Sequence, residues 1–96
     1  MSAQETCMAL QAGIVLEGEV KTEKGVIRVK RRIDRKMVWD LEYRGEFEGS
    51  GDVEEMEDGK YLVSFTIQKG KGFAILVEEA ESLADALRRV AEVAES

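Results

Sequence analysis

The residues best suited to bind a ligand are cations and aromatic rings near the middle of the chain. Four cations lie within residues 31–36, namely Arg31, Arg32, Arg35 and Lys36. Three aromatic residues then follow at every fourth position: Trp39, Tyr43 and Phe47. Cationic side chains bind phosphates, and exposed rings stack on bases at ~1–3 kcal/mol per base. The arrangement predicts a surface for single-stranded nucleic acid, with DNA as the expected ligand.

A second group of cations lies in the sequence Lys69-Gly70-Lys71-Gly72. Glycine lets backbone N–H groups approach an anion, and Lys69 and Lys71 would add positive charge for phosphate binding. The spacing is not that of a P-loop, and no helix is expected to begin here. The alternative is a flexible hairpin loop with solubilising lysines.

Catalytic and metal-binding patterns are absent from the sequence. The chain has no His, and its single Cys7 has no imidazole to activate it. No motif of a hydrolase, a zinc protease or a dithiol oxidoreductase occurs. The acidic stretch 48–60 lacks the ligand spacing of an EF-hand calcium loop. We therefore expect no enzyme, no metal and no cofactor.

Hydrophobic periodicity predicts the elements that would hold these residues. Alternating apolar residues indicate strands over 14–21, 26–33, 37–47, 60–67 and 73–77. A capping pattern at Ser82 and apolar residues at helical spacing predict a helix over 82–95. The expected fold is one α+β domain over 1–96, a curved antiparallel meander of about five strands on a C-terminal amphipathic helix.

Two further segments are expected to lie outside the sheet. Residues 1–6 are polar and predict a frayed terminus. Residues 48–60 are acidic and glycine-rich, and Asp58-Gly59 is a strong hairpin signal. The sequence therefore predicts that 48–60 is a mobile acidic extension of a hairpin.

The chain carries a formal net charge of −6, which is distributed unevenly. Residues 21–36 contain eight basic and two acidic residues, whereas 40–58 contain nine acidic residues and one arginine. Short turns between the strands would align oppositely charged residues on the outer face: Glu17 and Glu19, Arg28 and Lys30, Asp40 and Glu42. This pairing predicts that uncompensated positive charge remains at the turn 31–36.

Composition also bears on the compartment and the source. Charged residues make up 35% of the chain and side-chain amides are few, which is typical of thermophile proteins. No apolar run approaches the ~18 residues of a membrane span, and residues 1–13 lack a signal-peptide pattern. We expect a cytoplasmic protein with no membrane contact.

The segments 26–43 and 70–90 resemble the core pattern of the positive-cofactor-four family. In both, a basic strand turns into an apolar, acidic and aromatic strand, and a later Lys-Gly strand runs into a closing amphipathic helix. The composition also resembles that of ThermoDBP-type archaeal proteins. This resemblance implies a homodimer that binds single-stranded DNA through a curved sheet. The acidic segment 48–58, the additional N-terminal strand and the negative net charge differ from that pattern.

Two functions therefore remain open. The first is a small single-stranded nucleic-acid-binding module that uses Arg31, Arg32, Arg35, Lys36, Trp39, Tyr43, Phe47, Lys69 and Lys71. The second is a protein-interaction or assembly module without nucleic acid. The burial of Trp39 and Tyr43 distinguishes them, because a buried ring belongs to the core and cannot stack on a base.

Overall fold

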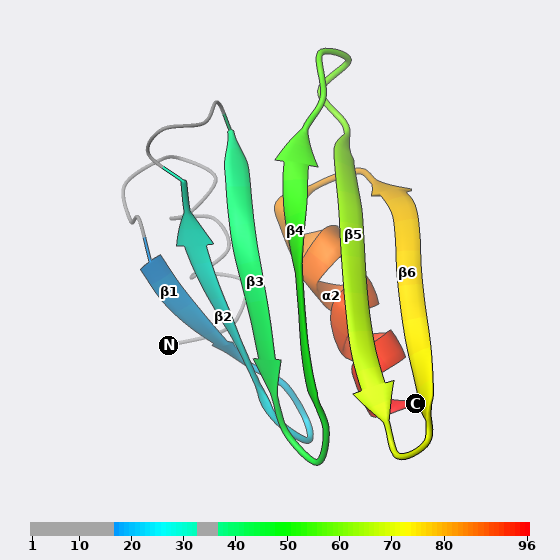
Figure 1. Cartoon of the computed structure of the whole chain (residues 1–96). Coiled ribbons are helices and arrows are strands. Elements are labelled where there is room, and N and C mark those ends of the chain that lie inside the picture. Colours follow the sequence, from blue (N-terminus) through cyan, green and yellow to red (C-terminus); the bar gives the residue numbers. More distant parts are fainter. Residues whose placement is uncertain (1–16, 33–36) are drawn as a thin grey trace.

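The computed structural model describes residues 17–32 and 37–96, which form an antiparallel sheet of six strands and one C-terminal helix (Figure 1). Each strand pairs with the next one along the chain, so the sheet is a meander. The strands are β1 (Glu17–Lys21), β2 (Val26–Arg31), β3 (Val38–Arg44), β4 (Glu48–Glu55), β5 (Tyr61–Lys69) and β6 (Gly72–Ala80). The helix is α2 (Leu83–Glu95). The α+β class is confirmed, with six strands rather than five.

The additional strand is β4, and its presence shows that the prediction of a mobile extension at 48–60 is wrong. Residues Glu48–Glu55 pair with β3 on one side and with β5 on the other. A Cβ atom on Gly51 would overlap the backbone oxygen of Ser64, and one on Gly49 would lie 2.6 Å from the ring of Phe65. Glycine therefore lets β4 approach the core closely, although it weakens the apolar pattern by which a strand is recognised.

Two glycines with positive φ form tight turns at the hairpins on either side of β5. Gly59, at the predicted Asp58-Gly59 turn, has φ +86° and donates its N–H to the backbone oxygen of Met56 at 3.0 Å. Gly70 has φ +60° and is the first of two residues between Lys69 and Gly72, which pair directly. A two-residue loop of this kind fixes the register of β6 against β5.

The predicted charge register across the first three strands is confirmed. Glu19 pairs with Arg28, and Lys30 pairs with Asp40. On the opposite face Val29 pairs with Leu41, and both side chains are buried. The first three strands therefore turn charged residues to one face of the sheet and apolar residues to the core.

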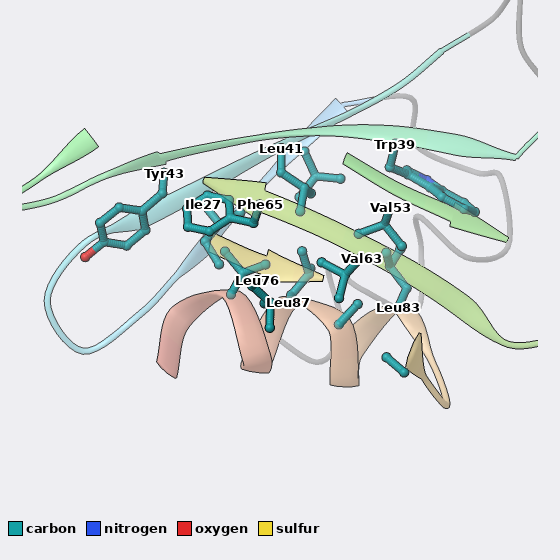
Figure 2. Packing of buried hydrophobic residues seen from close by; sticks show 14 of the residues in the cluster. Ile27, Trp39, Leu41, Tyr43, Val53, Val63, Phe65, Leu76, Leu83 and Leu87 are labelled. Atoms are coloured by element: carbon teal, nitrogen blue, oxygen red, sulfur yellow. The ribbon is translucent and has the colours of Figure 1, made fainter. Parts of the chain in front are cut away.

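The core lies between the inner face of the sheet and α2, which contacts β4, β5 and β6 (Figure 1). Ser82 begins the helix as predicted, because its hydroxyl accepts a hydrogen bond from the N–H of Asp85 at 3.0 Å. The helix buries five side chains: Leu83, Ala86, Leu87, Val90 and Ala94. Figure 2 shows Leu83 and Leu87 facing the sheet residues Val63 and Leu76.

The last residue of α2, Glu95, connects the helix to the other half of the sheet. Its carboxylate accepts hydrogen bonds from the Tyr43 hydroxyl at 2.9 Å, from the backbone N–H of Lys24 at 3.0 Å and from the Thr22 hydroxyl. Burial opposes ionisation of Glu95, but the hydrogen bonds from Thr22 and Tyr43 outweigh it and hold its pKa below the ordinary value. Burial, and then the Glu95 carboxylate, raise the pKa of Tyr43 to about 12. Glu95 thus joins α2 to β3 and to the loop between β1 and β2.

Candidate functional site

Two of the three aromatic rings predicted to stack on bases belong to the core. Trp39 is 0% exposed and Tyr43 is 1% exposed. Both point from β3 to the helix side of the sheet, as Figure 2 shows, and the Trp39 ring contacts that of Tyr61 at a centroid distance of 6.0 Å. Phe47 is partly buried and packs against the same cluster. A base has no access to the faces of Trp39 or Tyr43, so we remove both from the predicted binding surface.

Arg32 was predicted to be an uncompensated cation at the turn, and this prediction is wrong. Its Nε lies 2.8 and 3.0 Å from the two carboxylate oxygens of Asp40, and Nη2 lies 2.5 Å from the first of them. Asp52 on β4 lies 3.9 Å from the same Nη2. This bidentate pair satisfies much of the guanidinium, which therefore has less capacity for a phosphate.

Of the other predicted cations, Arg31, Lys69 and Lys71 lie within the described residues, and they do not form one surface with Arg32. Arg31 is partly buried and donates to the Met37 sulfur at 3.2 Å. Lys69 donates to the backbone oxygen and the hydroxyl of Ser96, both at 3.1 Å, whereas Lys71 is exposed. Residues 35 and 36, the predicted Arg35 and Lys36, lie outside the described residues.

The described cations Arg31 and Arg32 lie at the opposite end of the sheet from Lys69 and Lys71 (Figure 1). The pairing of strands carries Arg31 across β3 and β4 to Val63, near the start of β5. Lys69 is the last residue of β5, and Lys71 follows it in the next turn. A short oligonucleotide would therefore have to cross the strands between them, whose outward residues include Asp40, Asp52 and other acids.

The largest exposed apolar surface of the described residues lies elsewhere, on β6. Phe73 is 69% exposed, Ile75 is 70% exposed and Val77 is 62% exposed. All three alternate with the core residues Leu76 and Ala80, so they share the outer face of the strand. A contiguous row of exposed apolar side chains is a common feature of protein interaction sites.

Among residues 17–32 and 37–96, β6 is also an outer strand of the sheet, with β5 on one side only. It is nine residues long, whereas proteins commonly protect an edge by a short strand, a proline or a bulge. The chain contains no proline, and every residue from Gly72 to Ala80 has a partner in β5 without interruption. The exposed row Phe73–Ile75–Val77 and the backbone edge beside it form what we call the β6 edge.

The apolar run FAILV predicts a strand at 73–77 but does not by itself show which of its residues are exposed. A two-residue turn at Gly70-Lys71 determines which residues of the strand are exposed, because it fixes the register of β6 against β5. With Lys69 opposite Gly72, the inward residues of β5 pair with even-numbered residues of β6, as Phe65 does with Leu76. The odd-numbered residues must then face outward.

Further features limit the chemistry available to the described residues. They contain no group of three or more His, Cys, Asp or Glu side chains that could hold a metal ion. In the same part of the chain, no helix is both long and apolar enough to cross a membrane. Comparisons with family models, with curated proteins and with solved structures find no match to this chain. The resemblance to the positive-cofactor-four family thus stays a prediction.

Proposed function

We propose that this chain is a protein-interaction module that binds a β-strand of a partner protein along the β6 edge. The observation that carries the proposal is the exposure of Phe73, Ile75 and Val77 on an edge strand. In β-strand addition, main-chain hydrogen bonds to the open edge provide affinity and alternate side chains provide specificity. The β6 edge offers both elements at once.

Energetics favour a protein partner over a purely solvent-exposed role for this strand. Covering an apolar side chain of this size contributes ~1.5–3 kcal/mol when its burial is complete. Three such side chains, Phe73, Ile75 and Val77, alternate with inward residues along β6. An apolar strand that added to β6 would remove this row from water and pair the open backbone groups.

Electrostatics give the same preference. Sequence-independent affinity for nucleic acid depends on cations that neutralise phosphates. In this chain Arg32 is bound to Asp40, Lys69 is bound to Ser96, and the net charge is −6. A neutral apolar edge does not require such cations.

Photo-crosslinking at Ile75 tests this function. We would replace Ile75 with p-benzoylphenylalanine, irradiate the chain in nuclease-treated extract of its host and in purified form, and analyse the products by mass spectrometry. The matched control is the same substitution at Lys30, an exposed outward residue of β2. We expect position 75, but not position 30, to crosslink to protein in at least one of the two samples. Equal labelling at both positions would overturn the proposal.

A second candidate is nucleic-acid binding at the β5–β6 hairpin. It rests on a different observation, the exposed Phe73 ring two residues from the exposed Lys71. An aromatic ring beside a cation can stack on a base and contact its phosphate. A salt titration with a fluorescent single-stranded oligonucleotide tests it. Binding at low salt that Phe73→Ala weakens would support this candidate, and absence of binding at low salt would exclude it.

A further inference from the structure

The backbone groups available on the β6 edge follow from the turn before it. In a two-residue hairpin the closing residues, here Lys69 and Gly72, form a hydrogen-bonded pair. Because such pairs alternate along an antiparallel ladder, the even-numbered residues of β6 turn their N–H and C=O groups to β5. Phe73, Ile75 and Val77 therefore turn theirs to the open edge. The residues with exposed apolar side chains are also those with available backbone groups.

The order of side chains along this edge is self-complementary. Lys71 precedes the row, Ile75 is at its centre, and Glu79 follows it, with Lys71 and Glu79 both exposed. A two-fold axis through Ile75 would place a second copy of β6 antiparallel to the first. Lys71 of each copy would then lie opposite Glu79 of the other, and Phe73 opposite Val77. Both apolar and charged positions find complementary partners.

Other ways of pairing two copies fit less well. A parallel arrangement in register would place Lys71 opposite Lys71, which is unfavourable. An antiparallel shift of the register in one direction would place Lys71 opposite Val77, and a shift in the other would place Phe73 opposite Glu79. Only the arrangement centred on Ile75 matches apolar residues with apolar residues and opposite charges with each other.

We propose that the partner at the β6 edge is a second copy of this chain, paired antiparallel to β6 about a two-fold axis at Ile75. This inference rests on the proposed function of the edge as a protein-binding site. The two six-stranded sheets become one continuous sheet across the interface. The exposed rows of both copies lie side by side on the same face, and each copy covers the open backbone edge of the other.

Charge reversal at the two ends of the interface tests the register. Lys71→Glu and Glu79→Lys each place like charges opposite one another twice per dimer, and we expect the dissociation constant to rise about tenfold or more. An equimolar mixture of the two variants restores both attractive pairs, as does the double variant. Sedimentation velocity over a concentration series measures the dimer, and circular dichroism checks the fold. Lys30→Glu, a charge reversal remote from β6, should leave the dimer unchanged.

Disulfide trapping gives a second measurement that does not depend on charge. In a Cys7→Ser background, Ile75→Cys should form a covalent dimer under mild oxidation, because hydrogen-bonded residue pairs in antiparallel strands have Cα atoms about 5.5 Å apart, within the range of a disulfide. The matched control is Thr66→Cys, an exposed residue of β5 that pairs with Ile75 in the same chain. It lies one strand away from the interface and should remain monomeric.

The outcomes separate this inference from the proposed function. A purified chain that stays monomeric at every concentration, while position 75 crosslinks another protein in extract, overturns self-pairing and leaves the proposed function standing. A dimer whose dissociation constant is unchanged by both charge reversals, and which forms no disulfide at position 75, overturns the proposed register. Absence of a dimer together with absence of any crosslink at position 75 overturns both. Rescue by mixing the two charge variants supports a second copy, since a different partner would not provide the complementary change.

Discussion

Strands β2 and β6 both turn alternate side chains to the outer face of the sheet, but those of β2 are charged, whereas β6 presents three exposed apolar side chains, Phe73, Ile75 and Val77. On β2 the outward Arg28 lies 3.6 Å from Glu19 of β1, and Arg32 just beyond the strand is held by Asp40. On β6 the outward residues Phe73 and Ile75 are more than two-thirds exposed. A charged strand can thus complete its interactions with its neighbours, whereas an apolar edge strand requires another chain.

This contrast places the candidate binding site on β6, whereas the sequence alone favours the basic segment 26–36. The density of positive charge at residues 26–36 indicates a nucleic-acid-binding site, because clustered cations are typical of nucleic-acid binding. The segment FAILV looks like an ordinary core strand. Register decides otherwise, since it places acids beside the cations and turns Phe73, Ile75 and Val77 outward.

The largest expected effect comes from removing a buried ring. Trp39→Ala should lower the free energy of unfolding by about 3–5 kcal/mol, because it leaves a cavity in the core. Phe73→Ala, the matched change on the exposed row, should alter it by no more than about 0.5 kcal/mol in the monomer. Chemical denaturation followed by circular dichroism measures both. Similar losses for the two variants would contradict the assignment of core and surface.

The next effect concerns Glu95, which joins the two halves of the sheet. Glu95→Gln should destabilise the fold by roughly 1–3 kcal/mol near neutral pH, since the hydrogen bonds to the carboxylate are charge-assisted. The pKa of Glu95 is lowered in the folded state, so its contribution is present above the ordinary value of 4.5 and is lost as the pH falls through the folded value.

The pH dependence provides the control for Glu95. We expect the stability of the wild-type chain to fall more steeply below pH 4.5 than that of Glu95→Gln, as measured by denaturation at a series of pH values. At alkaline pH the stability depends on Tyr43 in the opposite direction, because the stability decreases as the pH rises. Its pKa rises from 10.0 to about 12, so its contribution is lost as the pH increases through this interval. If the stability of the wild-type chain and that of Glu95→Gln fell in parallel below pH 4.5, a role for the Glu95 carboxylate would be excluded.

A smaller effect is expected at Arg32. The pair with Asp40 is about one-third exposed on the arginine side, so solvent screens it. Arg32→Ala should therefore lower the free energy of unfolding by about 1 kcal/mol or less. Part of this loss would come from repulsion between Asp40 and Asp52, which would no longer have a cation between them. Thermal melts at low and high salt measure this effect, which should shrink as salt rises. A loss that is independent of salt would indicate packing of the arginine stem instead.

The smallest effect is expected at Arg28, whose pair with Glu19 joins two side chains that are more than half exposed. Arg28→Ala should change the free energy of unfolding by less than about 0.5 kcal/mol. If Arg28→Ala weakens oligonucleotide binding in the salt titration proposed above, the β2 face would bind nucleic acid despite its internal pairing. No change in either assay would strengthen the contrast with β6.

The strands and the helix were largely predictable because their apolar residues alternate or recur at helical spacing. The pairing of Glu19 with Arg28 followed from loop length and charge. β4 was not predictable in this way, since Gly49 and Gly51 take inward positions that a strand usually fills with apolar side chains, leaving Val53 as its buried residue. Its acids Glu48, Asp52 and Glu54 take outward positions, and they give the segment the composition of a loop.

The candidate site was predicted less well for a related reason. Residue type alone does not state whether an aromatic ring is buried, and Trp39 and Tyr43 share their face of β3 with Leu41. Nor does the density of charge state how much of it is paired, as Arg32 and Asp40 illustrate. Both properties depend on contacts between strands, which become visible once the register is known.

The carboxylate of Glu95 also has a consequence for the order of folding. Every strand pairs with its neighbour in sequence, so the sheet can grow hairpin by hairpin with short loops to close. The bond from Thr22 to Glu95 instead joins residues that are 73 positions apart, and its closure entropy favours late formation. We therefore expect Glu95→Gln to accelerate unfolding in stopped-flow experiments while changing the refolding rate little. The contacts of Glu95 at the C-terminal end of the helix would then chiefly slow the unfolding of a sheet that has already assembled.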